Sequence, residues 1–282
     1  MTRYPTAAAL LVFAAFVAGC GPEKELPVDV QKAENSTGQQ QVVPAQSEPE
    51  AKAVIDRAVK ALTSDKPELL AKLKTSRVAL KGFNFMNGPS QSIDAVRGIT
   101  AVWPDRYHAL DDLQMQGTRL LVETWLRRPD LVVHKNGEPN VPLTNLAERE
   151  QSLASDVLGQ HWMPLLLPAT DPKAVVFDLQ SVTFESKALR IMKLSLGTYP
   201  LYQLTFDAKD ALVRAEYTAT DSGVPRGTTM IFSDHKPGPD GLVLPHRFEC
   251  RHNNTVVERW TVEKWEFPAA IGDEQFSPPK KK

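Results

Sequence analysis

Hydrophobic residues recur at a helical spacing between residues 54 and 73 and at an extended spacing further along the chain. In the first stretch, apolar residues lie three or four positions apart with Lys, Asp and Arg between them, which predicts an amphipathic helix. The residues of this stripe are Val54, Ile55, Ala58, Val59 and Leu62. Pro67 fits the first turn of a second, short helix that continues to Leu73, because proline's missing N–H costs nothing there.

Most of the remaining chain reads as short strands. Runs rich in Val, Leu, Tyr, Phe and Thr are separated by pairs such as Asn136-Gly137 and Asp240-Gly241, which predict tight turns between antiparallel strands. The predicted strands are Arg77–Met86, Arg106–Asp112, Thr118–Leu126, Asp130–Lys135, Val175–Leu179, Leu189–Leu196, Leu201–Asp207, Leu212–Thr218, Thr228–Ser233, Leu242–His252 and Val256–Phe267. In the first of these the apolar parity switches at Gly82, which predicts a bulge or bend.

One helix interrupts the strands in the middle of the chain. Asn145 is a candidate N-cap, and an apolar stripe continues to about Trp162. Pro164 and Pro168 end the helix, since proline removes a helical hydrogen bond. The segment Trp162–Pro168 between helix and sheet is strongly apolar. We interpret it either as a lid or protruding loop, or as a buried connector between the helix and the sheet.

Several strands carry apolar residues on both parities, whereas a sheet buried on one face shows a cleaner alternation. This surplus favours an α+β, β-rich fold in which a curved antiparallel sheet wraps around helices and leaves a cavity. The alternative is a two-layer core with a few exposed apolar side chains, which is common.

The N-terminus carries a targeting signal. Arg3 precedes an apolar run, Ala7–Val17, that is too short to span a bilayer as a permanent helix. Val17-Ala18-Gly19-Cys20 resembles the lipobox of bacterial lipoproteins, which implies a signal peptide over residues 1–19 and lipidation of the Cys20 thiol. Gly21 then favours the outer membrane. The alternative is a secretory signal with a chance cysteine.

Composition divides the rest of the chain. Residues 20–50 are rich in Glu, Gln, Pro and Ser and predict a disordered tether, residues 51–278 form the folded domain, and residues 279–282 are a basic tail. The chain has 33 Lys and Arg against 34 Asp and Glu, a net charge of −1, which gives no reason to expect a nucleic-acid partner. With Cys20 assigned to lipid, Cys250 is expected to be a free thiol on a strand.

Several segments together resemble the outer-membrane lipoprotein-sorting superfamily (LolA/LolB-like), notably versions from planctomycete-type bacteria. They are Trp103–Tyr107, Tyr202–Asp207, Leu212–Tyr217, Phe232–His235, Asp240–Pro245 and Glu258–Phe267. The resemblance implies an incomplete β-barrel around helices, with an apolar cavity for acyl chains and no cofactor. Carriers of this superfamily are soluble and receptors are lipidated, so Cys20 is typical of a receptor. This chain is longer than the compact carriers.

The resemblance implies an outer-membrane lipoprotein, facing the periplasm, that binds an acyl chain or a lipidated protein without bond making. The residues expected to contact the ligand are Trp162, Met163, Leu165, Leu166, Leu167, Tyr202 and Phe206. The alternative function is a structural or interaction module of the envelope, with the cavity filled by its own side chains.

Three groups of residues are candidates for chemistry. His246, Cys250 and His252 share one parity of a strand and suit a transition metal, but residues four apart in an extended chain are too distant for easy joint ligation. Asp221–Pro225 echoes a serine-protease motif but consists of turn residues. His108 with Asp111 and Asp112 could form an acid–base set. No metal, cofactor or enzymatic activity is predicted.

Overall fold

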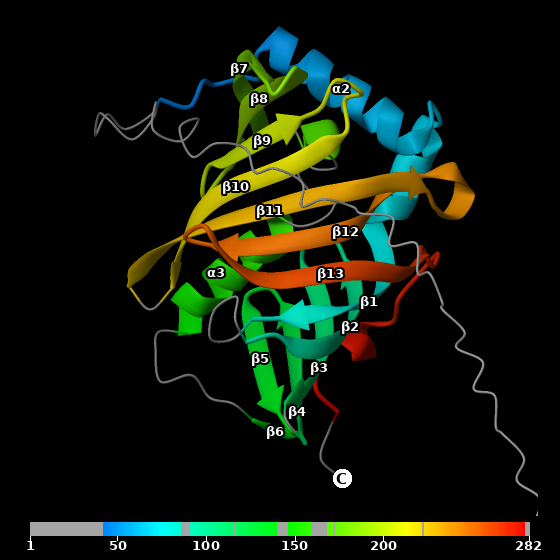
Figure 1. Ribbon diagram of the computed structural model, residues 1–282, viewed down its shortest axis with the longest axis vertical. Coiled ribbons are helices and arrows are strands. Elements are labelled where there is room, and N and C mark those ends of the chain that lie inside the picture. The colour runs from blue at the N-terminus through cyan, green and yellow to red at the C-terminus, as the bar shows by residue number, and fades with distance from the viewer. Residues whose placement is uncertain are drawn as a thin grey trace, which may run out of the picture. The chain divides into compact units, whose positions relative to one another are not determined.

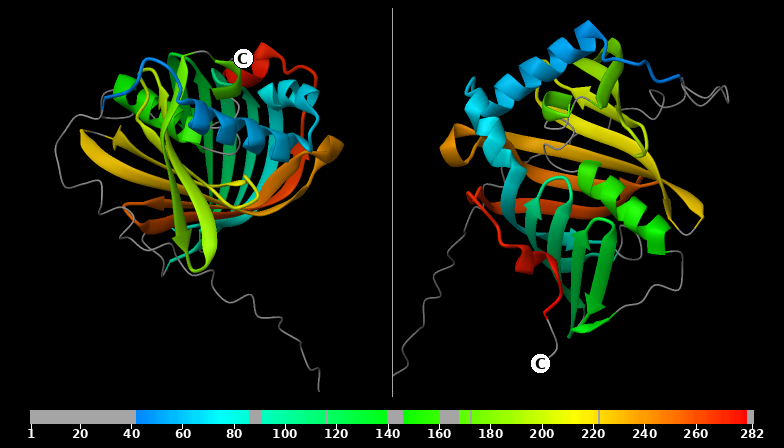
Figure 2. Two further views of the ribbon diagram at one scale, coloured as in Figure 1. Left: turned by 90° about the horizontal axis from the view of Figure 1, so that it is seen from above. Right: turned by 180° about the vertical axis from the view of Figure 1, so that it is seen from behind.

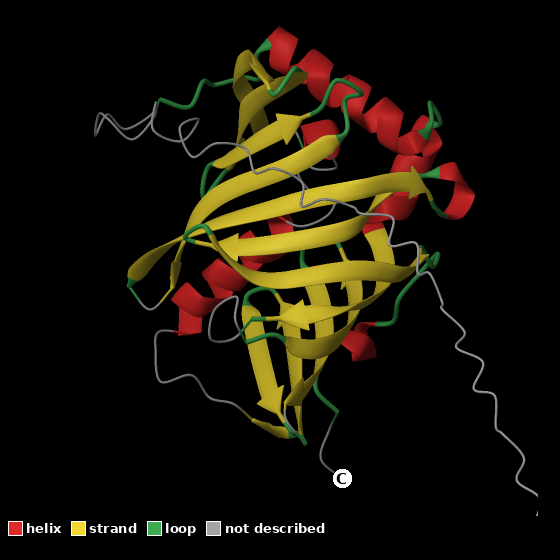
Figure 3. Cartoon of the chain, in the orientation of Figure 1, coloured by secondary structure: helices red, strands yellow, loops and turns green. Residues whose placement is uncertain are grey.

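The computed structural model describes residues 42–85, 91–115, 117–139, 146–159, 168–171, 173–221 and 223–279. Within these ranges the chain forms a single thirteen-stranded sheet with helices packed on it (Figures 1 and 3). None of the described helices is long and apolar enough to cross a membrane. The helices are α2 (Pro49–Thr63), α3 (Leu146–Gly159), and the 3₁₀ helices η1 (Pro67–Lys74), η2 (Pro239–Gly241) and η3 (Asp273–Phe276).

Every neighbouring pair of strands in the sheet is antiparallel, in the order β6-β5-β4-β3-β2-β1-β13-β12-β11-β10-β9-β8-β7. The strands are β1 (Thr75–Asn84), β2 (Ile93–Val102), β3 (Arg106–Met115), β4 (Thr118–Arg127), β5 (Asp130–Lys135), β6 (Glu138–Pro139), β7 (Ala174–Phe184), β8 (Lys187–Leu196), β9 (Tyr202–Phe206), β10 (Leu212–Asp221), β11 (Val224–Pro237), β12 (Val243–His252) and β13 (Thr255–Glu266).

The sheet is an open barrel around its helices. Its end strands β6 and β7 do not pair with each other. Helix α3 contacts both β10 and β5, which lie far apart in the strand order, so the sheet must curve around it. Helix α2 lies against β7 and β12, and Figure 2 shows both helices on the concave side. The predicted fold class is therefore confirmed.

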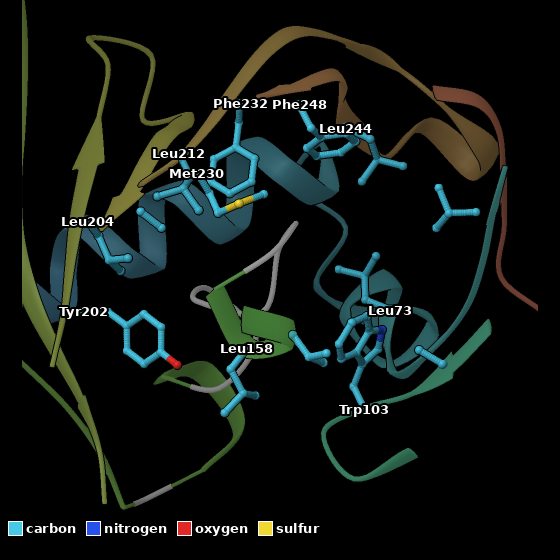
Figure 4. Packing of buried hydrophobic residues seen from close by; sticks show 14 of the residues in the cluster. Leu73, Trp103, Leu158, Tyr202, Leu204, Leu212, Met230, Phe232, Leu244 and Phe248 are labelled. Atoms are coloured by element: carbon cyan, nitrogen blue, oxygen red, sulfur yellow. The ribbon is translucent and has the colours of Figure 1, made fainter. Parts of the chain in front are cut away.

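The inner face of the sheet and the helices share one hydrophobic core. The predicted stripe of α2 is buried, and Ile55 is fully so. Figure 4 shows Leu212, Phe232 and Leu244 on the sheet beside α2, with Tyr202 close to Leu158 of α3. Because side chains alternate between the faces of a strand, the residues between these inner positions form the outer face.

Each predicted strand is present, but two strands escaped prediction. One is β6, which has two residues, and the other is β2, a full central strand. On the inner face of β2 small alanines alternate with larger residues, and Arg97 occupies one of the inner positions. This charged residue breaks the apolar alternation by which strands are identified in a sequence.

The predicted bulge at Gly82 is wrong. The pairing of β1 with β13 shifts between Ala79 and Leu80, so the extra residue is Glu263 of β13. Gly82 has a different role, because a Cβ atom there would lie 1.9 Å from the backbone oxygen of Arg259. Glycine therefore allows the backbones of β1 and β13 to approach, and a side chain at this position would displace β13.

The folded unit begins upstream of Ala51. The backbone N–H of Glu48 donates to the Val176 carbonyl of β7 (2.9 Å), and the Val176 N–H donates to Ser47 Oγ (3.1 Å). The last residues of the predicted tether thus belong to this unit. Contacts divide the chain into Met1–Gln41 and Val42–Lys282, and the described residues of the second unit have a hydrophobic core of their own, which is the property of a domain that folds by itself.

Candidate functional site

A pocket of about 450 Å³ lies between α2 and the part of the sheet formed by β9 to β12. We call it the α2 pocket. Its apolar lining consists of Ala58, Ala61, Leu62, Ala211, Leu212, Phe232, Val243 and Pro245, and its polar lining consists of Asp207, Lys209 and His235. Its volume lies within the range of about 300–1,000 Å³ that is usual for small-molecule sites.

Small side chains on α2 leave the space for this pocket. Ala58 and Ala61 line it one turn apart on the helix, where larger residues would fill it. On the opposite side, Phe232 and Leu212 are almost fully buried and belong to the core. The wall is therefore a part of the core that the helix does not cover completely.

The polar residues of the α2 pocket come from one neighbourhood of the fold. Asp207 opens the turn between β9 and β10, where its Oδ1 accepts the backbone N–H groups of Lys209 and Ala211, both at 2.9 Å. His235 follows Asp234, whose φ of 57° turns the backbone of β11. Burial lowers the pKa of His235 below its ordinary value, although Asp207 acts in the opposite direction. His235 is therefore neutral at pH 7.

The α3 side of the concavity is polar, in contrast to the α2 pocket. Arg97 of β2 lies on the inner face and forms hydrogen bonds with Asp111 of β3 (2.5 and 3.2 Å) and Glu258 of β13 (2.8 and 2.9 Å). Its guanidinium also lies 4.5 Å from the ring centre of Trp260. We call Arg97, Asp111 and Glu258 the ionic cluster. Burial raises the pKa of Glu258, but the charge and hydrogen bonds of Arg97 outweigh it and hold this pKa below its ordinary value.

Helix α3 is bound to the sheet by a second set of polar contacts. Asp156 accepts hydrogen bonds from Arg226 of β11 (2.5 Å) and from the Tyr217 hydroxyl of β10 (2.7 Å). The Tyr202 hydroxyl donates to the Ser155 carbonyl (2.9 Å). Burial raises the pKa of Asp156 above its ordinary value, and Arg226 and Tyr217 counteract part of this shift. These contacts favour a fixed helix on this side.

Two of the predicted ligand residues are described. Tyr202 and Phe206 lie on β9, fully buried in the core, and neither lines the α2 pocket. Trp162, Met163, Leu165, Leu166 and Leu167 lie outside the described residues, as do Cys20 and the candidate N-cap Asn145. The predicted ligand contacts therefore stay predictions.

The candidate acid–base set is separated by the sheet. His108 lies on the outer face, where Nε2 contacts Glu123 (3.0 Å) and the ring stacks on Trp125. Asp111 belongs to the ionic cluster on the inner face, and Asp112 pairs with Arg119. His108 and Asp111 therefore lie on opposite faces of the sheet, and the Asp112 carboxylate is engaged by Arg119.

The described residues of the other two candidate groups lie on strands of the sheet or at the hairpin between two of them. Cys250 is a buried free thiol on β12, as predicted, and burial raises its pKa well above the ordinary value. Its Sγ lies 3.8 Å from His252 Nε2, while His246 Nδ1 contacts the Leu244 carbonyl. In the described part of the chain, no three His, Cys, Asp or Glu residues gather in a way that could hold a metal ion. Asp221 is the last residue of β10 and pairs with Val224 of β11, and Pro225 pairs with Thr220, so these residues belong to the β10–β11 hairpin.

Sequence reasoning missed the lining of the α2 pocket. The helical spacing places Ala58 and Leu62 on the buried stripe of the helix, but the facing residues come from β10, β11 and β12 and are distant in sequence. The one available signal was the small size of Ala58 and Ala61, which predicts space beside the helix.

No protein-family model matches the sequence, and no curated protein matches it. Among solved structures, a LolA superfamily protein from Nitrosomonas europaea aligns with a TM-score of 0.50 at 12% identity, over 84% of this chain and 98% of its own. A domain named for outer membrane lipoprotein sorting, from Vibrio parahaemolyticus, covers 78% of this chain and 97% of its own at 11% identity, with a TM-score of 0.47. The resemblance drawn from the sequence is thus confirmed at the level of architecture, and the described chain has the open, helix-filled barrel fold of the LolA superfamily.

Proposed function

We propose that the folded unit binds one apolar chain, such as the acyl chain of a lipid or of a lipidated protein, in the α2 pocket. The observation that carries this proposal is the apolar wall formed by α2 and the β10–β12 strands around about 450 Å³. Each Å² of apolar surface that a ligand removes from water contributes about 25 cal/mol, so an acyl chain gains substantially from such a wall.

The polar side of the concavity supports the same location. An acyl chain placed between α3 and the sheet would have to lie against Arg97, Arg226 and their carboxylate partners. An acyl chain in that position would disturb these ion pairs, and it could not replace their hydrogen bonds. The α2 pocket offers apolar contact without this cost.

Filling the α2 pocket is expected to abolish ligand binding. Ala61→Phe places a ring in the space beside Leu62 and Leu212, whereas Ala53→Phe adds the same ring on the exposed side of α2. Both changes reduce helix propensity by a similar small amount, about 0.5 kcal/mol. The measurement is mass spectrometry of the lipids extracted by organic solvent from purified Val42–Lys282 after incubation with envelope lipids.

We expect Ala61→Phe to reduce the extracted lipid by tenfold or more, and Ala53→Phe to retain the wild-type amount. Equal amounts of lipid on both variants would place the ligand elsewhere. No lipid on the wild-type unit would favour the alternative function, an envelope module without ligand. Fully buried Tyr202 and Phe206 are consistent with that alternative, because they fill their part of the concavity.

We further propose that a lipid on Cys20 attaches this unit to the outer membrane, facing the periplasm. The lipobox-like residues before Cys20 support this, and two or three acyl chains anchor a protein stably where one does not. Cys20→Ser cannot form the thioether, so this variant should move from the detergent phase to the aqueous phase, or stay uncleaved, in phase partitioning. A cleaved Cys20→Ser chain that still partitions into detergent would refute the anchor.

A further inference from the structure

The polar side of the α2 pocket has an uncompensated positive charge. Asp210 forms ion pairs with Arg57 (3.3 Å) and Arg190 (2.7 Å). No described residue forms an ion pair with Lys209, which lines the pocket. Around this turn three cations therefore face two carboxylates, those of Asp207 and Asp210, which leaves a net charge of +1.

The Asp207 carboxylate does not offset Lys209 directly. Its Oδ1 accepts two backbone N–H groups within the turn, one from Lys209 itself and one from Ala211. The backbone therefore holds the carboxylate in the turn, while the Lys209 side chain is exposed to solvent beside the pocket. An ammonium in this position is available to a ligand.

His235 adds a second polar group on the same side. It is half-buried, lies close enough to Asp207 for their charges to interact, and contacts the Leu212 backbone. Its ring N–H is engaged by the Leu212 backbone, and because the ring is neutral at pH 7 it adds no charge of its own to the pocket. The opposite side of the pocket, on α2, consists only of Ala58, Ala61 and Leu62.

We propose that the α2 pocket selects a single-chain amphiphile with an anionic head, whose chain lies against α2 and whose carboxylate or phosphate lies at Lys209. This inference rests on the proposed function, since it names the class of ligand for the same pocket. The volume of about 450 Å³ is in the lower half of the usual range, which suits one chain rather than several.

The test compares three dodecyl compounds that differ only in the head: dodecanoate, dodecyl phosphate and dodecanol. Binding to Val42–Lys282 is measured by calorimetry at pH 7.5, where the carboxylate is ionised. The variant is Lys209→Glu, and the matched control is Lys187→Glu. Lys187 is also exposed and lies at the start of β8, outside the pocket lining. Circular dichroism checks that both variants are folded.

We expect at least one anion to bind about tenfold more tightly than dodecanol, and the tighter anion identifies the head as carboxylate or phosphate. Lys209→Glu should weaken binding of that anion about three- to tenfold and leave dodecanol unchanged, whereas Lys187→Glu changes neither. Raising the salt concentration should weaken only the anion.

Two outcomes would overturn this inference while leaving the proposed function intact. One is dodecanol binding as tightly as both anions, and the other is the same affinity for the anion in Lys209→Glu and Lys187→Glu. If Lys209→Glu weakens dodecanol as much as the anion, the variant disturbs the pocket and the charge assignment is also wrong. If none of the three compounds binds, the proposed function fails and the inference fails with it.

Discussion

Replacing Arg97 by methionine is expected to lower the free energy of unfolding by about 3–5 kcal/mol at pH 7. The substitution removes the only cation of the ionic cluster and leaves Asp111 and Glu258 facing each other on the inner face. All three side chains are at most 20% exposed, so water compensates little for the lost partner. Urea unfolding followed by tryptophan fluorescence measures the loss.

The same substitution should change how stability depends on pH. In the wild type the pKa of Glu258 lies below its ordinary value of 4.5, so this group stabilises the fold above that pH, and the contribution is lost as the pH falls through the folded pKa. In Arg97→Met burial, the largest influence, is opposed only by the Trp260 hydrogen bond and by His252, so the pKa of Glu258 rises and stability then falls as the pH rises. The deficit of the variant should therefore be smaller at pH 5 than at pH 7.

Arg119→Met is the matched control for this experiment. Arg119 also pairs with an aspartate, Asp112, next to Asp111 in the sequence, but on the exposed outer face. We expect little change in stability from this variant, because exposed pairs are screened by water. Equal losses from Arg97→Met and Arg119→Met would show that burial of the ionic cluster has no special importance.

Replacing Arg226 by leucine is expected to cost a similar amount, about 3–5 kcal/mol at pH 7. Asp156 of α3 would lose its cation and retain the hydrogen bond from Tyr217. The double variant Arg226→Leu/Asp156→Leu removes both charges and should recover most of this loss, because an apolar pair needs no compensation. If the double variant is no more stable than the single one, charge pairing is not what holds α3.

The pH dependence again gives an independent check. The pKa of Asp156 lies above its ordinary value of 3.8, so the folded state binds this proton more tightly than the unfolded chain. The resulting stabilisation is complete below about pH 3.8 and is lost as the pH rises through the folded pKa. Arg226 limits that loss, so the deficit of Arg226→Leu should grow as the pH rises. In Arg226→Leu, hydrogen exchange of the backbone amides should be accelerated more in α3 than in α2, relative to the wild type.

The fold was predictable where burial follows a simple period. The α2 stripe and the alternating strands are buried on one side, and Gly and Asn pairs occupy the turns between them. Prediction failed for β2, because Arg97 takes an inner position whose charge is compensated only by residues of β3 and β13. From the sequence alone a charged residue is assigned to the exposed face, because its partners on other strands are not visible there.

The candidate site was less predictable than the fold. The α2 pocket arises where small residues of a helix meet three strands and the β9–β10 turn, so no single segment of the sequence predicts it. The sequence singles out the apolar segment Trp162–Pro168 because hydrophobicity is a property of the local sequence. A pocket formed by distant segments leaves no such local signal. Lys209 reads as an ordinary surface lysine until Asp210 is seen to pair with Arg57 and Arg190.

An open barrel keeps two sheet edges that a closed barrel would abolish, and an exposed edge is a template for pairing with another chain. Here each edge is obstructed in part. At β7 the groups of Val176 are already bonded to Ser47 and Glu48, and at the other end β6 has two residues, one of which is Pro139. Proline has no N–H to offer a neighbouring strand. The architecture can thus remain open for a ligand without inviting the edge-to-edge aggregation to which crowded β-proteins are prone.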